Sequence, residues 1–220
     1  MKKQYRIGFC VSGKGRLMQS AILNASLIGV EGAKVILDTN SDPEIVTFCS
    51  QHNVKYTKLK SPSEEKFHRE INEQCLDADL DLLILTFDRI IPISLINNFN
   101  GKIINVHPSL LPSFKGTNAL NKAANKGVRF AGATIHEIDE HIDSGAIISQ
   151  CIIPIQKGEN AESMGKRLFP YLRSMYLQTI HWYATDRIFT DDLGRIWVKD
   201  AVYGEMPISP ALELTIPNRR

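Results

Sequence analysis

The chain has 220 residues, of which 43% are hydrophobic and 23% are charged, and its formal net charge is +2. This composition is typical of a globular protein, and the length suits one domain with a full core. Domains that bind nucleic acid carry a strong basic charge, and this chain does not. We therefore expect a globular protein without a nucleic-acid partner. Both a monomer and a homodimer are open expectations, since the sequence does not reveal the oligomeric state.

The cysteines and the apolar runs indicate the compartment. The four cysteines, at positions 10, 49, 75 and 151, are widely spaced and form no CxxC pair. This spacing predicts neither a zinc site nor a disulfide framework, so we expect buried thiols in a reducing cytoplasm. The first residues lack the apolar core of a signal peptide, and no apolar run approaches the roughly 20 residues of a membrane span. We expect a cytoplasmic protein with no membrane partner.

Apolar runs alternate with amphipathic segments through the first half of the chain. Strands are expected at 5–11, 34–38, 54–59, 80–86 and 102–106. Helices are expected at 17–27, from Ser41, from Ser61 and at 92–98. Such alternation predicts a doubly wound, mostly parallel sheet with helices on both faces, which is an α/β fold.

The second half departs from this alternation. We expect a helix at 118–126, strands at 132–137 and 146–155 that extend the sheet in antiparallel fashion, and a long amphipathic helix at 161–183. A short hairpin is expected around residues 191–194, within a C-terminal extension. We expect one main domain at residues 1–186, with a hairpin and tail at 187–220 packed on it.

Asn105 and His107 stand at the end of the strand expected at 102–106. Pro108 follows and stops the strand, because proline cannot donate a ladder hydrogen bond. Side chains two residues apart lie on the same side of a strand, and ligands of open α/β sheets bind at the carboxyl ends of strands. An amide and an imidazole together can stabilise an oxyanion or move a proton. The alternative is a turn histidine beside a structural asparagine.

Two segments resemble one known family. The sequence NVHPSLLP at residues 105–112 resembles the signature of the 10-formyltetrahydrofolate-dependent formyltransferases. The sequence DEHIDSG at residues 139–145 resembles the downstream loop of that family and places its aspartate at Asp143. The resemblance covers roughly residues 5 to 183. It implies a Rossmann-like fold and the transfer of a formyl group from 10-formyltetrahydrofolate to an amine, without a metal.

The resemblance also assigns residues to roles. It implies that Asn105 and His107 stabilise the oxyanion and that Asp143 assists proton transfer. The residues implied to bind the folate are Phe87, Arg89, Ile90, Ile91, Asp139, Glu140 and His141. The residues implied to bind the acceptor are Gly13, Lys14, Gly15, Arg16 and Gly116. The glycine segment could equally be a tight turn, since it matches no phosphate-loop fingerprint. His136 is expected to be structural.

The acceptor is less well specified. The layout resembles the glycinamide ribonucleotide formyltransferases of purine synthesis, so glycinamide ribonucleotide is the leading candidate. Those enzymes carry a glutamine and a glutamate where this chain has Phe169 and Leu172. A nucleotide-linked amino sugar, or another specialised amine, is therefore an alternative acceptor. A folate-binding protein without catalysis is a further alternative, because a fold alone does not define an activity.

Overall fold

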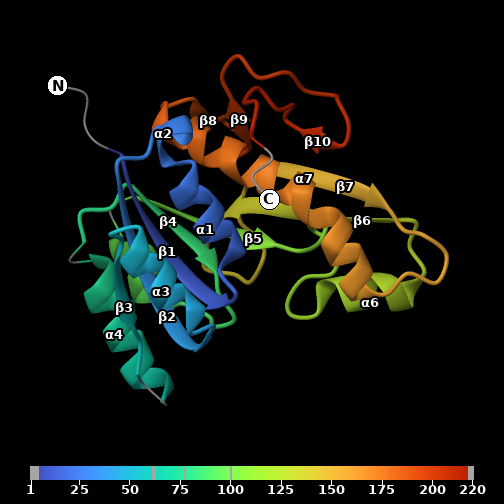
Figure 1. Ribbon diagram of the computed structural model, residues 1–220. Coiled ribbons are helices and arrows are strands. Elements are labelled where there is room, and N and C mark those ends of the chain that lie inside the picture. Colours follow the sequence, from blue (N-terminus) through green and yellow to red (C-terminus); the bar gives the residue numbers. More distant parts are fainter. Residues whose placement is uncertain (1–4, 61–62, 77, 100, 218–220) are drawn as a thin grey trace. The chain divides into compact units, whose positions relative to one another are not determined.

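The computed structural model describes residues 5–60, 63–76, 78–99 and 101–217 (Figure 1). The chain folds into two compact units, residues 1–105 and residues 106–220. Eight strands form one hydrogen-bonded sheet in the order β10-β7-β6-β5-β4-β1-β2-β3. The pairs β1–β2, β1–β4, β2–β3 and β4–β5 are parallel, whereas β6–β7 and β7–β10 are antiparallel. The predicted mostly parallel sheet with an antiparallel extension is confirmed.

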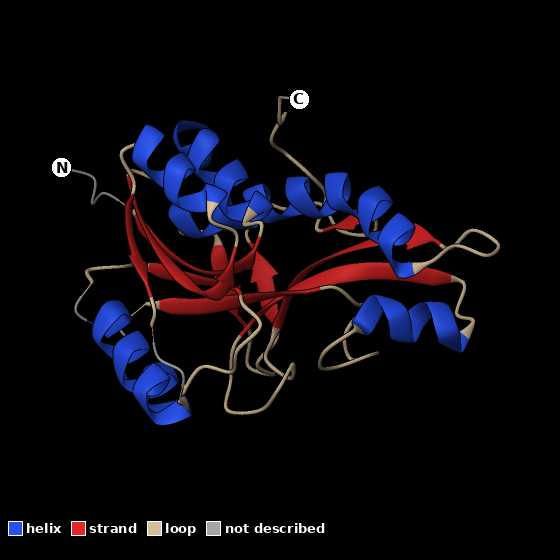
Figure 2. Ribbon diagram, turned by 60° about the horizontal axis from the view of Figure 1, so that its bottom comes forward, coloured by secondary structure: helices blue, strands red, loops and turns tan. Residues whose placement is uncertain are grey.

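The first unit contains the predicted alternation of strands and helices. Its elements are β1 (Arg6–Gly13), α1 (Arg16–Leu23), α2 (Ala25–Ile28), β2 (Gly32–Ser41), α3 (Glu44–Gln51), β3 (Lys55–Lys58), α4 (Glu64–Leu76), β4 (Leu82–Thr86), α5 (Ile93–Asn98) and β5 (Lys102–His107). Helices cover both faces of these parallel strands (Figure 2). The inner strands β1 and β4 are mostly buried, as expected when both faces are covered, whereas the edge strand β3 is mostly exposed. The last two residues of β5 belong to the second unit.

One predicted helix is interrupted in the structure, and the predicted start of another lies outside the described residues. The helix predicted at 17–27 is interrupted at Asn24, which has φ −115° and separates α1 from α2. The Asn24 amide donates to the carbonyl of Ser20 at 2.8 Å. Asparagine competes in this way for backbone partners, and it therefore interrupts helices. The predicted helix start at Ser61 lies outside the described residues.

The second unit is built around one long helix. Its elements after β5 are α6 (Ala119–Lys126), β6 (Phe130–Glu137), β7 (Ile147–Pro154), α7 (Ala161–Ala184), β8 (Ile188–Thr190), β9 (Ile196–Val198) and β10 (Ile208–Ser209). Asn160 caps the N-terminus of α7, and its side chain accepts a hydrogen bond from the Ser163 amide at 2.9 Å. This N-cap satisfies one of the free amides of the first turn. The helix packs on β6 and β7 (Figure 1).

The C-terminal segment is structured and attached to α7. The predicted hairpin around residues 191–194 is confirmed as β8 and β9, which are antiparallel. The Gln178 side chain, fully buried in α7, accepts hydrogen bonds from the amides of Glu213 and Leu214 at 2.9 and 2.8 Å. The pairing of β10 with β7 was not predicted, since a strand of two residues has no hydrophobic pattern to detect. The predicted domain boundary at residue 186 stays a prediction.

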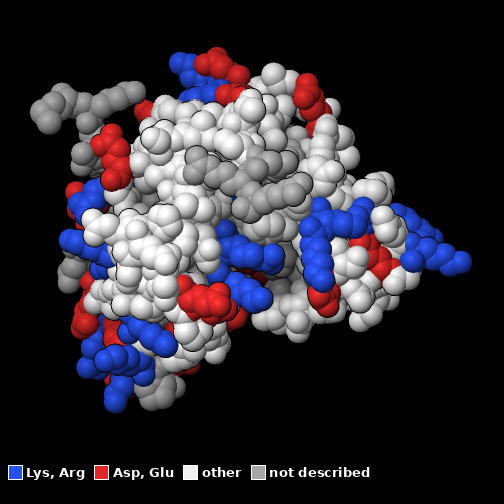
Figure 3. Space-filling view, in the orientation of Figure 1, with Lys and Arg blue, Asp and Glu red and all other residues white. Residues whose placement is uncertain are grey.

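Other sequence predictions concern the surface and the thiols. All four cysteines are free and buried, as predicted. Acidic and basic side chains are interspersed on the visible face of each unit (Figure 3). Among the helices of the described residues, none is long and apolar enough to cross a membrane. Within the same residues, no group of three or more His, Cys, Asp or Glu side chains is arranged to hold a metal ion.

Candidate active site

The turn that follows β5 is fixed by polar side chains of β6 and β7. The Thr134 hydroxyl donates to the carbonyl of Ser109 at 2.7 Å and accepts from the amide of Leu111 at 3.1 Å. The Gln150 amide donates to the carbonyl of Leu111 at 3.1 Å. Thr134 is fully buried, so these bonds are shielded from water. The network holds the chain directly after His107 in one conformation.

His107 is buried and its ring has a partner on each side. Its Nε2 lies 3.0 Å from the carbonyl oxygen of Phe114. A carbonyl can only accept, so Nε2 carries the proton in this contact. Its Nδ1 lies 3.4 Å from Oδ2 of Asp143, and the side chains are 7% and 9% exposed, respectively. His107 and Asp143 therefore contact each other within the second unit.

The Asp143 carboxylate is held by the backbone and by a second histidine. The Gly116 amide donates to Oδ2 of Asp143 at 2.7 Å. Oδ1 lies 3.7 Å from Nε2 of His136. Asp143 has φ +50°, a left-handed conformation that aspartate tolerates better than most residues. These contacts orient the carboxylate toward both imidazoles.

His136 joins the candidate site through its contact with the Asp143 carboxylate, whereas the sequence analysis expected it to be structural. Burial lowers the pKa of His136 from its usual value of 6.5, although the backbone contact with Glu137 and the charge of Asp143 partly oppose this effect. Its Nδ1 donates a hydrogen bond to the Glu137 carbonyl at 2.8 Å. The only available signal was its place on a strand shortly before the Asp143 loop.

The 139–145 loop is folded around hydrogen bonds among its own residues. Burial by itself would raise the pKa of Asp139, but hydrogen bonds from Ser144 and the His141 amide lower it below its usual value. A Cβ atom on Gly145 would lie 1.8 Å from the Glu137 carbonyl oxygen, so only glycine fits there. Among the residues of this loop that are expected to bind folate, Glu140 and His141 are exposed and Asp139 is half-buried.

Three strand ends of the first unit share a polar cluster. The Ser12 hydroxyl donates to Asp38 at 2.6 Å and accepts from the Asp88 amide at 2.9 Å. Asp38 is fully buried and also accepts from the hydroxyl of Ser41 at 3.1 Å. This cluster links the ends of β1 and β2 to the segment after β4. The cluster therefore holds in place the chain at the start of two segments with predicted binding roles, residues 13–16 and residues 87–91.

The expected anion-binding segment, residues 13–16, runs from the last residue of β1 to the first residue of α1. Gly13 and Gly15 have φ values of +61° and +59°, which glycine adopts without strain. Lys14 and Arg16 are exposed, and α1 begins at Arg16. The segment therefore presents basic side chains beside the N-terminus of a helix, where anions are favoured. Its predicted role in acceptor binding stays a prediction.

The expected folate segment of the first unit follows β4. The Arg89 guanidinium lies over the Phe67 ring at 3.6 Å from the centroid, and the Phe67 and Phe87 rings are 5.8 Å apart. Ile90 is 69% exposed, whereas Ile91 is buried. Arg89 is thus held on an aromatic platform by a cation–π contact.

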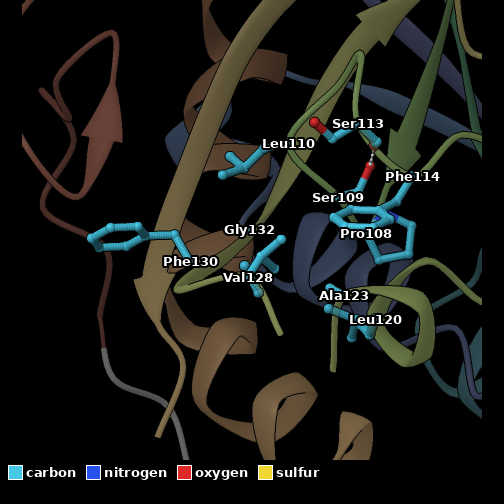
Figure 4. Close-up of a pocket in the computed structure, with 11 residues that line it drawn as sticks. Pro108, Ser109, Leu110, Ser113, Phe114, Leu120, Ala123, Val128, Phe130 and Gly132 are labelled. Atoms are coloured by element: carbon cyan, nitrogen blue, oxygen red, sulfur yellow. Dashed lines mark hydrogen bonds between the residues drawn. The ribbon is translucent and has the colours of Figure 1, made fainter. Parts of the chain in front are cut away.

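A cavity of about 100 Å³ lies beside the turn that follows His107 (Figure 4). Its lining residues are Pro108, Ser109, Leu110, Ser113, Phe114, Leu120, Ala123, Val128, Phe130, Ala131 and Gly132. The Ser109 hydroxyl donates to the carbonyl of Ser113 along its wall. Sites for molecules of drug size occupy about 300–1,000 Å³, so this cavity is too small for a folate.

Comparison with known proteins defines the class. The model of the formyl transferase family matches residues 5–180 of this chain. The chain belongs to this family.

Particular relatives are similar along most of the chain. A chloroplastic phosphoribosylglycinamide formyltransferase of Vigna unguiculata is 33% identical over 211 residues, covering 91% of this chain and 65% of the relative. The human trifunctional purine biosynthetic protein adenosine-3 is 29% identical over 211 residues, and this chain spans only 20% of its length. The crystal structure of glycinamide ribonucleotide transformylase 1 from Symbiobacterium toebii has a TM-score of 0.82 at 27% identity, covering 90% of this chain and 95% of that one.

Proposed function

We propose that this chain transfers a formyl group from 10-formyltetrahydrofolate to the amine of a small anionic acceptor, with glycinamide ribonucleotide as the leading candidate. The observation that carries the proposal is the buried contact between His107 and Asp143, in a chain of the formyl transferase family whose Asn105 precedes His107 by two residues in β5. The names of similar proteins favour the same acceptor.

The chemistry assigns a role to each of the three residues. The acceptor nitrogen attacks the formyl carbon, the carbonyl becomes an oxyanion, and the bond from carbon to the folate nitrogen then breaks. The Asn105 amide and the His107 imidazolium stabilise the oxyanion, and one such donor contributes about 10²–10³ in rate. Asp143 stabilises the imidazolium by its charge and assists the transfer of a proton from the amine to the departing folate nitrogen.

This mechanism requires a change at His107. Its Nε2 proton is directed at the Phe114 carbonyl, whereas the oxyanion needs a donor. The substrate oxygen must therefore replace the Phe114 carbonyl as the acceptor. The Nδ1 contact with Asp143 can persist during this exchange, because it lies on the other side of the ring.

The residues Phe169 and Leu172 of α7 favour a second candidate for the formyl acceptor. Both are half-buried apolar side chains in α7, and neither can hold an ammonium group. The neighbouring Arg173 donates to the Pro217 carbonyl at 3.5 Å and carries the wrong charge for that task. A nucleotide-linked amino sugar is the second candidate on this ground.

The test is a formyl-transfer assay with the 5,8-dideaza analogue of the donor, in which release of the deformylated folate is followed at saturating glycinamide ribonucleotide. We expect turnover in the original protein and its loss in Asn105→Ala and His107→Ala. Tight folate binding without turnover would refute this acceptor and direct the search to nucleotide-linked amino sugars. If the protein neither bound the folate nor turned over, the proposal that it is a formyltransferase would be refuted.

A further inference from the structure

One short loop of the second unit contacts both members of the buried His107–Asp143 pair. The Phe114 carbonyl oxygen lies 3.0 Å from Nε2 of His107. Two residues later, the Gly116 amide donates to Oδ2 of Asp143 at 2.7 Å. All four residues belong to the second unit. The backbone of this loop therefore engages the imidazole and the carboxylate together. We call residues 113–118 the latch loop.

The latch loop has an unusual backbone at the residue that contacts His107. Phe114, Gly116 and Asn118 have left-handed φ values of +56°, +74° and +59°. Glycine adopts this conformation without strain and asparagine tolerates it, but a bulky side chain such as phenylalanine disfavours it. Such a conformation persists only where the surrounding contacts hold it. The loop is therefore strained at Phe114 while its carbonyl contacts the imidazole.

Side chains, rather than a helix or a strand, hold the latch loop in place. The Ser109 hydroxyl donates to the Ser113 carbonyl at 2.6 Å. The Lys122 ammonium donates to the Lys115 carbonyl at 2.9 Å. Ser113 and Lys115 are exposed, and Phe114 is half-buried. A segment with so few buried groups opens more readily than the core does.

The cavity beside the latch loop gives Phe114 room to move. Ser113 and Phe114 line this cavity of about 100 Å³, together with apolar side chains such as Leu110 and Leu120 (Figure 4). Protein interiors are otherwise close-packed, so a displaced side chain usually forces its neighbours to move. Here an aromatic ring can shift into apolar space that is already present.

We propose that the latch loop closes the candidate active site in the free protein and opens as one unit to expose Nε2 of His107. In the closed state the Phe114 carbonyl occupies the position where a substrate oxygen would accept from Nε2. A ligand that takes over this hydrogen bond binds only the open state, so it shifts the loop toward opening. The inference rests on the proposed function, which makes the formyl donor this ligand. Strain at Phe114 favours opening, because the open loop can leave the left-handed conformation.

The experiment compares Phe114→Gly with Phe114→Ala, because both lack the ring and only glycine adopts the left-handed φ without strain. Hydrogen exchange of the Gly116 amide and of the His107 Nε2 proton is followed by heteronuclear NMR in the whole chain. We expect both protons to exchange about 5- to 30-fold more slowly in Phe114→Gly, the factor that corresponds to the strain of a left-handed alanine. The apparent Kd of the 5,8-dideaza donor analogue should rise by the same factor, since fewer molecules are open. Asp200→Gly, which relaxes a φ of +59° outside the loop, should change none of these quantities.

Two results would overturn the latch. One is equal exchange of the His107 Nε2 proton in Phe114→Gly and Phe114→Ala, because its exposure would then not depend on the loop backbone. The other is equal affinity of the two variants for the donor analogue despite slower exchange, because the loop would then not need to open for binding. If the original protein does not bind the analogue, the proposed function is refuted, and the two exchange rates alone decide whether the loop controls access to His107.

Discussion

Replacement of Asp143 by asparagine separates the charge of this side chain from its shape. Asparagine can still accept the hydrogen bond from the Gly116 amide, and it tolerates the left-handed φ of +50° at this position. What disappears is the negative charge 3.4 Å from Nδ1 of His107. The variant therefore tests whether this charge supports the imidazolium during formyl transfer.

The expected magnitude follows from the distance. With an effective dielectric constant of about 20, two unit charges 3.4 Å apart interact by about 5 kcal/mol. At about 1.4 kcal/mol per tenfold change, this corresponds to at most about 10³–10⁴ in kcat. Residual hydrogen bonding by the asparagine amide reduces the loss, so we expect kcat to fall by about 10²–10⁴, the range of general acid–base contributions.

The assay is the release of deformylated folate under saturating conditions, with a thermal melt as the measure of folding. The matched control is Asp186→Asn, because Asp186 also has a left-handed φ, of +55°, but is exposed at the end of α7. The control should retain full activity. A folded Asp143→Asn protein with kcat within about two-fold of the original would refute the role of this charge.

Three further predictions concern stability and reactivity. Because burial lowers the pKa of His136 below 6.5, the unfolded chain binds more protons just below that pH, so stability should fall as pH decreases through this window, and His136→Gln should reduce the slope in urea unfolding. Gly145→Ala should lower the free energy of unfolding by about 1–3 kcal/mol, since its Cβ would overlap the Glu137 carbonyl. The buried thiols, among them Cys151 with a pKa raised to about 12, should not react with a disulfide reagent in the native protein.

Each of these three has a direct control. Urea unfolding above about pH 7 should show no contribution of His136 to the pH slope, because the residue is then neutral in both states. Gly165→Ala places its Cβ 3.6 Å from Leu120, an ordinary contact, and should not destabilise the chain. All four thiols should react once the protein is unfolded in denaturant. Rapid labelling of the native chain would show that burial does not protect them.

The sheet could be predicted because each of its strands is marked by the apolar pattern of its own residues. Buried parallel strands are continuous apolar runs such as Leu82–Thr86, and the segments between them carry helical periodicity. The break at Asn24 was not predicted, because the apolar pattern continues across it. Strand β10 was not predicted either, since Ile208 and Ser209 form a strand only through their pairing with β7.

The candidate site was predictable only in part. The end of β5 at His107 is marked by proline, but the strand alone left a turn histidine beside a structural asparagine as an open alternative. Asp143 was identified only through the family resemblance, because no local pattern connects it with a histidine 36 residues earlier. The contacts of Phe114, Gly116 and His136 depend on how distant segments pack, which neither propensity nor motif encodes.

The most direct test of the proposed activity is to follow the formyl carbon itself. The protein would be supplied with 10-formyltetrahydrofolate labelled in the formyl group and with glycinamide ribonucleotide, and the label would be located in the products. We predict that the label appears on the amine of the acceptor in the original protein and in Asp186→Asn, and is nearly absent in Asp143→Asn. Label that remains on the folate, or is released only as formate, would contradict the account.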